Sequence, residues 1–273
     1  MQLGLLAGLA GCTPHLSTAP LPQGAGSLSR IELSVSNVYV VEGSGGAVLV
    51  DAGDPDQEGD VLNALARLEI HPASVRLLVV THAHADHIGS AAALQARLSV
   101  PVALARADVA TARAGHNPTM HPTGPTAELL LLVLRQDFAP VAPELLVDGC
   151  LDLADYGVEG RLVAAPGHTP GSSVVLLAGG DAIVGDLALG GYLGGTIAPQ
   201  VPTEHYFQEH PRAVRAILEW LLASGAERFH LGHGGPVSAE DLRTALAGGD
   251  LGPPPDQPFV PDCPALTRTS PPR

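Results

Sequence analysis

Residues 81–89, Thr-His-Ala-His-Ala-Asp-His-Ile-Gly, are the stretch that decides how this chain is interpreted. They place four candidate metal ligands on one short segment: His82, His84, Asp86 and His87. Neutral imidazole and carboxylate groups are the ligand types that suit a borderline divalent metal such as zinc. The alternative is a polar turn rich in histidine, but four such side chains on one turn would be an unusual use of polar residues.

The segments on either side place this motif on a turn between a strand and a helix. Residues 76–80 (RLLVV) form an apolar, β-branched run that is typical of a buried strand. Residues 88–98 (IGSAAALQARL) carry apolar side chains at helical spacing and are rich in good helix formers. An open α/β sheet gathers its ligands beyond the carboxyl ends of its strands, so we predict a metal site at this turn.

The pattern His-x-His-x-Asp-His after a hydrophobic strand resembles the signature of the metallo-β-lactamase-fold hydrolases. This superfamily includes β-lactamases, glyoxalase II-type thioesterases, lactonases, persulfide dioxygenases and nucleases. The resemblance covers about residues 31–246, because later segments match the family's pattern in order. It implies an α/β protein with the αββα four-layer sandwich, in which two mixed β-sheets are flanked by helices.

Later segments supply the rest of the ligand set that this resemblance implies. His168 lies in Gly-His-Thr-Pro-Gly, Asp186 follows an expected hairpin, and His233 lies in Gly-His-Gly-Gly. By resemblance, His82, His84 and His168 hold one metal ion, Asp86, His87 and His233 hold a second, and Asp186 bridges them. The implied cofactors are two divalent ions, Zn²⁺ in the first place, with Fe or Mn as alternatives. Asp51, in Asp-Ala-Gly, is expected to lie behind the site and orient a ligand histidine.

The resemblance implies a hydrolase that cleaves an ester, a lactone or a thioester. A hydroxide that bridges the metals would attack the carbonyl carbon while one metal polarises the carbonyl oxygen. Asp86 would orient this hydroxide, and Tyr192 is a candidate for assisting the leaving oxygen, as a tyrosine does in lactonases. Three alternatives stay open: a mononuclear iron persulfide dioxygenase, a metallo-β-lactamase, and an envelope-anchored binding protein without turnover. Bridging Asp186 argues against the β-lactamase branches, which lack it.

Composition limits the class of substrate. The chain has 273 residues, 45% of them hydrophobic, which is enough for one large domain with a full core. All of its basic residues are arginine, so chemistry based on a lysine Schiff base is excluded. The net charge of −14 argues against nucleic acid as a partner, because phosphate binding needs local positive charge. We expect a small-molecule substrate with an apolar portion.

Residues 1–12 (MQLGLLAGLAGC) are apolar but too short to span a bilayer. They resemble the core of a secretory signal, and Leu-Ala-Gly-Cys resembles a bacterial lipobox in which Cys12 is lipidated. The alternative is an apolar N-terminus with an incidental cysteine, since no basic residue precedes the apolar run. The resemblance implies a bacterial cell envelope protein, lipid-anchored or exported, with membrane contact only through Cys12. If the segment is not a signal, we expect a cytoplasmic protein.

The rest of the chain divides into three parts by composition. Residues 13–30 are rich in Pro, Gly and Ser and are predicted to form a flexible tether. Residues 31–247 are predicted to form the catalytic domain, and residues 248–273 a Pro-rich disordered tail. Cys150 and Cys263 lack zinc-like spacing; they could pair in an oxidising compartment, but nothing in the sequence requires it.

Residues 128–138 (ELLLLVLRQDF) are an intensely apolar helix candidate. Such a helix is either part of the core or covers something apolar, here a wall or lid over the metal site. Five of the remaining histidines match no position of the family pattern and are interpreted as surface or structural residues: His15, His71, His205, His210 and His230. His116 and His121 lie in the loop before this helix candidate and are given no functional role unless they lie near the metals.

Overall fold

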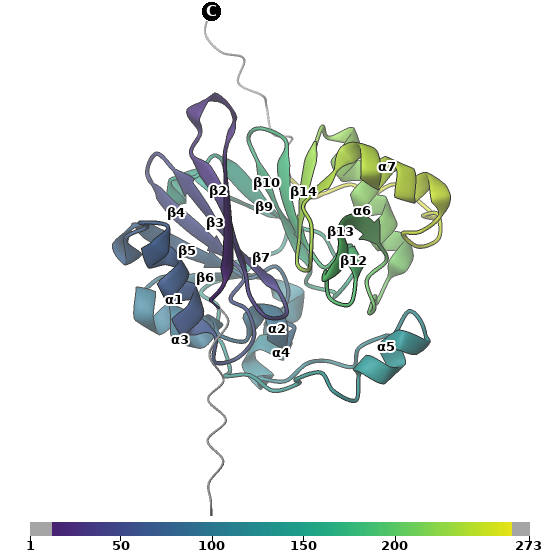
Figure 1. Cartoon of the computed structure of the whole chain (residues 1–273), viewed down its shortest axis with the longest axis horizontal. Helices are drawn as coiled ribbons and strands as arrows, with labels where there is room; N and C mark the ends of the chain where they lie inside the picture. Colours follow the sequence, from purple (N-terminus) through teal and green to yellow (C-terminus); the bar gives the residue numbers. More distant parts are fainter. Residues whose placement is uncertain (1–12, 264–273) are drawn as a thin grey trace, which may run out of the picture.

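The computed structural model describes residues 13–263 (Figure 1). Two β-sheets pack face to face, and helices cover the outer face of each, so the predicted αββα sandwich is confirmed. Residues 1–12, and with them Cys12, lie outside the described part. No helix within residues 13–263 is long and apolar enough to cross a membrane.

The first sheet has seven strands in chain order. Its first four strands form an antiparallel meander, and the last four pair in parallel. The parallel part carries the predicted motif, because residues 81–87 directly follow the end of the fifth strand. The strands are β1 (His15–Pro20), β2 (Ser27–Glu32), β3 (Asn37–Gly43), β4 (Gly46–Val50), β5 (Val75–Val79), β6 (Val102–Ala105) and β7 (Leu145–Val147).

The second sheet has six strands in the order β15-β14-β11-β10-β9-β8. All of its pairs are antiparallel except β11 with β14, which run parallel and therefore end at the same edge. A separate two-stranded hairpin is formed by β12 and β13. The bounds are β8 (Cys150–Asp152), β9 (Gly160–Ala164), β10 (Ser173–Leu177), β11 (Asp181–Gly185), β12 (Leu189–Tyr192), β13 (Ile197–Thr203), β14 (Arg228–Leu231) and β15 (Val237–Ser238).

The helices complete the layers. The outer face of the first sheet packs against α1 (Glu58–Arg67) and α3 (Ala91–Leu98), and that of the second against α6 (Pro211–Ala223) and α7 (Ala239–Gly248) (Figure 1). Alternate residues of a strand face opposite layers, as Val40 and Tyr39 of β3 do. The short helices are α2 (Ala85–Ile88), α4 (Val109–Ala114) and α5 (Pro125–Leu130), with 3-10 turns at Pro22–Gly24, Pro72–Ser74, Arg106–Asp108 and Ala154–Tyr156.

The predictions of a flexible tether at residues 13–30 and a disordered tail from residue 248 are both wrong within the described residues. Residues 15–20 pair with β2 along their whole length, from His15 opposite Glu32 to Pro20 opposite Ser27. An edge strand tolerates proline and needs only backbone pairing, so its Pro- and Ser-rich composition was misleading. In the expected tail, Leu251 is buried, Phe259 packs against Trp220 and Cys263 forms a disulfide with Cys150.

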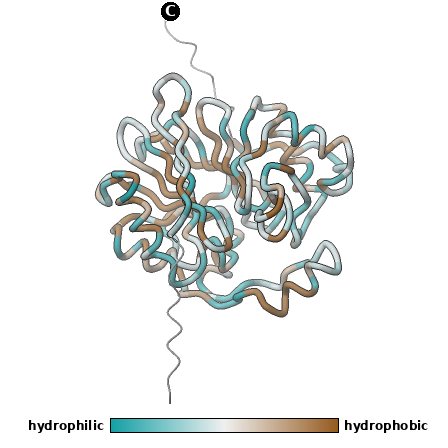
Figure 2. Tube along the Cα trace, viewed as in Figure 1, coloured by the Kyte–Doolittle hydropathy of each residue, from teal (hydrophilic) through white to brown (hydrophobic). Residues whose placement is uncertain are grey.

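The apolar segment predicted as one long helix is shorter and exposed. Helix α5 ends at Leu130, and the chain continues in turns. Leu129, Leu132 and Val133 are 66%, 79% and 77% exposed, so the core-helix alternative is wrong. Figure 1 shows α5 on an arm that stands away from the sandwich, and Figure 2 shows a hydrophobic part of this arm around α5, with the rest white to teal. We call residues 115–138 the arm.

Candidate metal centre

Four separate turns deliver the predicted ligands to one edge of the sandwich. His82 and His84 follow β5, and Asp86 and His87 lie on the first turn of α2. His168 lies between β9 and β10, Asp186 follows β11, and His233 follows β14. The two sheets thus contribute from the same edge, which is where strand ends place ligands in an open α/β sheet.

The structure brings all seven predicted ligands together in two adjoining groups. Within each group the potential ligand atoms lie within 4.8 Å of one another. The first group is His82, His84 and His168, and the second is Asp86, His87, Asp186 and His233. All of these residues are buried except Asp86, whose side chain is 24% exposed. Asp86 is therefore the ligand candidate on the solvent side of the cluster.

Asp186 lies between the two groups. Its Oδ2 atom is 3.7 Å from Nε2 of both His82 and His168, which belong to the first group. The same oxygen is 3.3 Å from Nε2 of His87 and 3.4 Å from Nε2 of His233, which belong to the second. This central position is the one that a carboxylate shared by two cations must occupy.

Unpaired polar atoms show that the cluster fits metal ions. Among residues 13–263, His82 Nε2, His87 Nε2 and Asp186 Oδ1 are buried and have no hydrogen-bond partner. A buried polar atom left unpaired costs about 1–3 kcal/mol, so several of them facing one point would be unfavourable in a purely structural cluster. Imidazole and carboxylate donors that surround divalent cations satisfy all of these atoms at once.

The pKa values divide the histidines into two kinds. Burial lowers the pKa of His84 to about 4 and that of His168 to about 3, which keeps both in the neutral form that binds metal. Burial also lowers the pKa of His233, but the carboxylates of Asp186 and Asp86 outweigh it and raise that pKa to about 10. Without metal, the second group therefore carries protons that a metal ion must displace.

Hydrogen bonds on the outer side of the cluster fix the ring orientations. Asp51 accepts from His87 Nδ1 at 2.9 Å and from the backbone N–H of Thr81 at 2.7 Å. Asp51 thus lies behind the site, where it was predicted. The Nδ1 atoms of His168 and His233 each lie 2.8 Å from a backbone carbonyl, of Phe207 and Val35 respectively. Each contact leaves Nε2 facing the cluster, as a metal ligand requires.

Asp108 was missed by sequence analysis and ties two ligand turns together. Its buried carboxylate accepts from the backbone N–H of Ala83 at 2.9 Å, between the first two ligand histidines. It also accepts from Thr169 Oγ1 and from the Gly171 N–H, both at 2.8 Å, beside His168. The partners are far apart in sequence, so no local pattern could have identified this residue.

The sequence predicted that His205 is either a surface residue or a structural residue. The surface alternative is wrong. His205 is only 5% exposed, and its Nε2 atom lies 3.2 Å from Asp186 Oδ2. Tyr192, by contrast, is 55% exposed at the end of β12. The ring of Tyr206 lies 6.2 Å from the His205 ring, measured between centroids.

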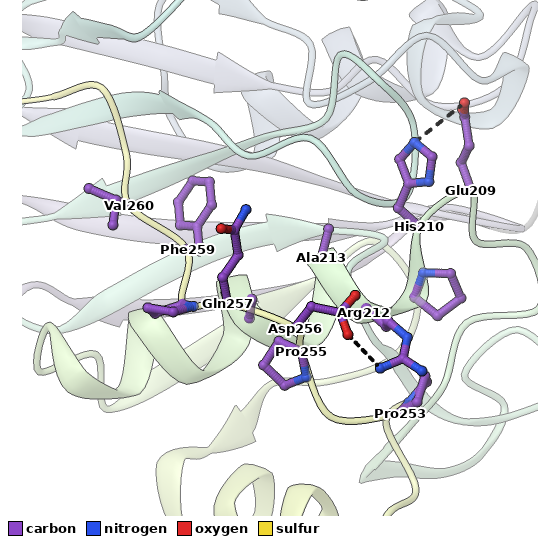
Figure 3. Close-up of a pocket in the computed structure, with 13 residues that line it drawn as sticks. Glu209, His210, Arg212, Ala213, Pro253, Pro255, Asp256, Gln257, Phe259 and Val260 are labelled. Carbon is purple, nitrogen blue, oxygen red and sulfur yellow. Dashed lines mark hydrogen bonds and ion pairs between the residues drawn. The ribbon is translucent and has the colours of Figure 1, made fainter.

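Two cavities lie near this edge. One, of about 10 Å³, adjoins His84 and His168 and is bordered by residues 118–121 of the arm. The other, of about 780 Å³, lies between the start of α6 and residues 253–260 (Figure 3). An ion pair between Arg212 and Asp256 crosses it, and none of the seven ligand candidates lines it. The larger cavity is thus a seam along the C-terminal segment, separate from the metal cluster.

Comparisons with known proteins agree with this geometry. The model of the metallo-β-lactamase superfamily matches residues 31–269, so the chain belongs to that superfamily, whose members are mostly metal-dependent hydrolases. The probable metallo-hydrolase YflN of Bacillus subtilis (strain 168) is 25% identical over 255 residues, which cover 85% of this chain and 95% of that protein. The hydroxyacylglutathione hydrolase of Anaeromyxobacter dehalogenans (strain 2CP-C) is 31% identical over 148 residues, 54% of this chain and 44% of that protein.

Solved structures show the same fold. A metallo-β-lactamase of Cronobacter sakazakii superposes with a TM-score of 0.57 at 19% identity, over 81% of this chain and 78% of that one. A protein crystallised in a di-iron-bound form has a TM-score of 0.55 at 26% identity, over 76% of this chain and 91% of that one.

Proposed function

We propose that this protein is a binuclear metal-dependent hydrolase that cleaves an ester, a lactone or a thioester. The observation that carries the proposal is the position of Asp186, whose Oδ2 atom lies within 3.7 Å of histidines from both ligand groups. A carboxylate oxygen between two groups of histidines is the arrangement that lets one side chain serve two ions.

The residues that would hold the ions follow from the two groups. His82, His84 and His168 would hold one, Asp86, His87 and His233 the other, and Asp186 both. When bound, the ions lower the pKa of a shared water toward about 7 and polarise the substrate carbonyl. Burial raises the pKa of Asp86, but His87 and His233 outweigh it and hold that pKa well below its ordinary value. Asp86 therefore stays ionised at neutral pH and can act as a hydrogen-bond acceptor on the solvent side of the cluster.

Exposed apolar side chains on two elements that are joined to the segment of His205 support a substrate with an apolar portion. The arm is joined to the segment that follows β13, because Thr123 Oγ1 donates to the His205 carbonyl at 3.0 Å. The β12–β13 hairpin is joined to the same segment through the Leu193 N–H and the Tyr206 hydroxyl. Leucine and valine side chains of the arm, together with Leu193 and Ile197 of the hairpin, are exposed on these two elements.

Export from the cytoplasm is a further part of the proposal. The disulfide between Cys150 and Cys263 supports it, because structural disulfides form and persist in oxidising compartments. Lipidation of Cys12 would anchor the protein to the envelope. Labelling with a clickable fatty acid tests this anchor: the wild-type chain should be labelled and Cys12→Ala should not, and equal labelling of both would exclude it.

Metal analysis and a substrate panel on one preparation test the proposed reaction. We expect about two metal ions per chain, zinc in the first place, and hydrolysis of chromogenic esters, lactones or thioesters. One iron per chain with uptake of oxygen would instead indicate the persulfide dioxygenase. Hydrolysis confined to a β-lactam substrate would indicate the β-lactamase, and turnover of no substrate by metal-loaded protein would indicate a binding protein.

Variants then test the metal mechanism. His84→Ala and Asp186→Ala should each lower kcat/KM by more than about 100-fold, because each removes a ligand. The matched control is His210→Ala, since the His210 side chain is 62% exposed and forms an ion pair with neighbouring Glu209 rather than with the cluster. The mechanism is wrong if folded His84→Ala and Asp186→Ala proteins retain full hydrolysis.

A further inference from the structure

A short irregular segment between β13 and α6 holds a histidine beside the metal cluster. Thr123 of the arm fixes this segment: its backbone N–H donates to the Tyr206 carbonyl at 2.9 Å, and its hydroxyl donates to the His205 carbonyl at 3.0 Å. His205 is 5% exposed. Its position is therefore set by the fold and shielded from solvent.

The His205 ring is oriented like those of the proposed ligands. Its Nδ1 atom contacts the Phe207 backbone, 3.1 Å from the carbonyl oxygen that also lies 2.8 Å from His168 Nδ1. The His205 ring lies 4.7 Å from the His168 ring and 5.6 Å from the His233 ring, measured between centroids. The opposite nitrogen, Nε2, is 3.2 Å from Asp186 Oδ2. That distance is shorter than those from the four proposed ligand histidines that surround the same oxygen, which are 3.3–3.7 Å.

Hydrogen bonding to Asp186 does not account for this arrangement. Five imidazole nitrogens surround one carboxylate oxygen. Such an oxygen has about two lone pairs, so it cannot accept from all five. Metal ions bound by the carboxylate and the imidazole rings would explain why all five nitrogens lie so close to one oxygen. The His205 nitrogen lies as close to that oxygen as the nitrogens of the four proposed ligand histidines do. The ligand atoms of His168, Asp186 and His205 lie within 4.8 Å of one another, as do those of each main group.

We propose that His205 is a sixth metal-binding histidine, which joins His168 and Asp186 around the ion that His82 and His84 also hold. This inference rests on the proposed binuclear centre. It gives that ion five protein ligands and leaves the second ion with four. The ion on the His205 side is therefore the more tightly held, and the protein loads its two ions in sequence.

NMR of the wild-type chain tests the proposal directly. In protein with ¹⁵N-labelled histidine and loaded with ¹¹³Cd, a ligating imidazole nitrogen shows a one-bond cadmium splitting. We expect six of the 12 histidines to be split, with His205 among them. Five split histidines without His205 would overturn this inference and leave the binuclear centre intact. No split histidine at all would overturn the centre itself.

Variants separate a ligand from a residue that only positions Asp186. His205→Asn should weaken retention of one ion against a competing chelator by about 10–100-fold or more, and His210→Asn should not. The d–d absorption of the cobalt-substituted His205→Asn protein should also change, because the ion loses a nitrogen donor. His205→Gln can still donate a hydrogen bond to Asp186. Wild-type affinity and an unchanged cobalt spectrum in His205→Gln would overturn ligation and assign His205 a positioning role.

Discussion

Replacing Asp108 by asparagine should loosen the first ligand group without touching any ligand. The buried carboxylate connects the turn of His82 and His84 with the turn of His168 through three hydrogen bonds. Asparagine has almost the same shape but only one acceptor oxygen. Its amide NH₂ group must therefore face at least one backbone N–H that now has no acceptor.

The magnitude follows from those contacts. A hydrogen bond to a charged group contributes about 1.5–3 kcal/mol, and the variant loses at least one such bond and weakens the others. Burial of the ionised carboxylate is itself unfavourable, since burial raises the pKa of Asp108, and asparagine removes that cost. We expect the free energy of unfolding of the metal-free protein to fall by about 2–4 kcal/mol. We also expect the affinity for the more tightly held ion to fall about 10–100-fold.

Urea unfolding and chelator competition measure these two quantities. Asp148→Asn is the matched control, because Asp148 is an exposed carboxylate that pairs with the exposed Arg106. Exposed pairs contribute about 1 kcal/mol at most, so this control should change stability little and metal affinity not at all. Equal effects of Asp108→Asn and Asp148→Asn on metal affinity would refute the positioning role of Asp108.

Three further predictions use other contacts of the site and the second sheet. Asp51→Asn should weaken binding of the second ion about 10–100-fold, because an amide cannot accept equally well from His87 Nδ1; unchanged competition with a chelator would contradict this. Isothermal titration calorimetry in several buffers at pH 8 measures how many protons each ion displaces. The second ion should release at least about two protons more than the first, because Asp186 and neighbouring carboxylates raise the pKa of both His87 and His233. Equal proton release by both ions would be inconsistent with these pKa shifts. Asp181→Asn should cost about 1–3 kcal/mol at pH 7, measured by urea unfolding, because Asp181 accepts hydrogen bonds from His230 and Arg228. These hydrogen bonds outweigh burial and lower the pKa of Asp181. The stability difference between wild type and Asp181→Asn should therefore shrink as the pH falls through that lowered pKa. A stability difference that is independent of pH would exclude the ionised carboxylate as its cause.

The sequence was sufficient for the sandwich and for the seven proposed ligands, for a definite reason. Each of these ligands lies on a turn just after a strand or between two strands, in a short pattern of histidine, aspartate and glycine. The position of such a turn is set by the strand that precedes it and depends little on the rest of the chain. Parallel pairing of β4 with β5, and of β11 with β14, then brings the turns to one edge.

The sequence was insufficient where a residue's role depends on distant partners. His205 lies in an irregular segment that owes its place to Thr123, 82 residues earlier, so nothing nearby distinguishes it from an exposed histidine. Composition also misled for β1, because an edge strand needs only backbone pairing and tolerates a proline such as Pro20. The arm shows the reverse case, in which apolar residues that predicted burial are exposed.

Anomalous diffraction from crystals of the zinc-loaded protein tests the central claim most directly. Data collected on either side of the zinc absorption edge locate each ion independently of its ligands. We predict two peaks, one on each side of Asp186, with ligand distances of about 2.0–2.2 Å. A single peak, or peaks that contact neither Asp186 nor His168, would contradict it.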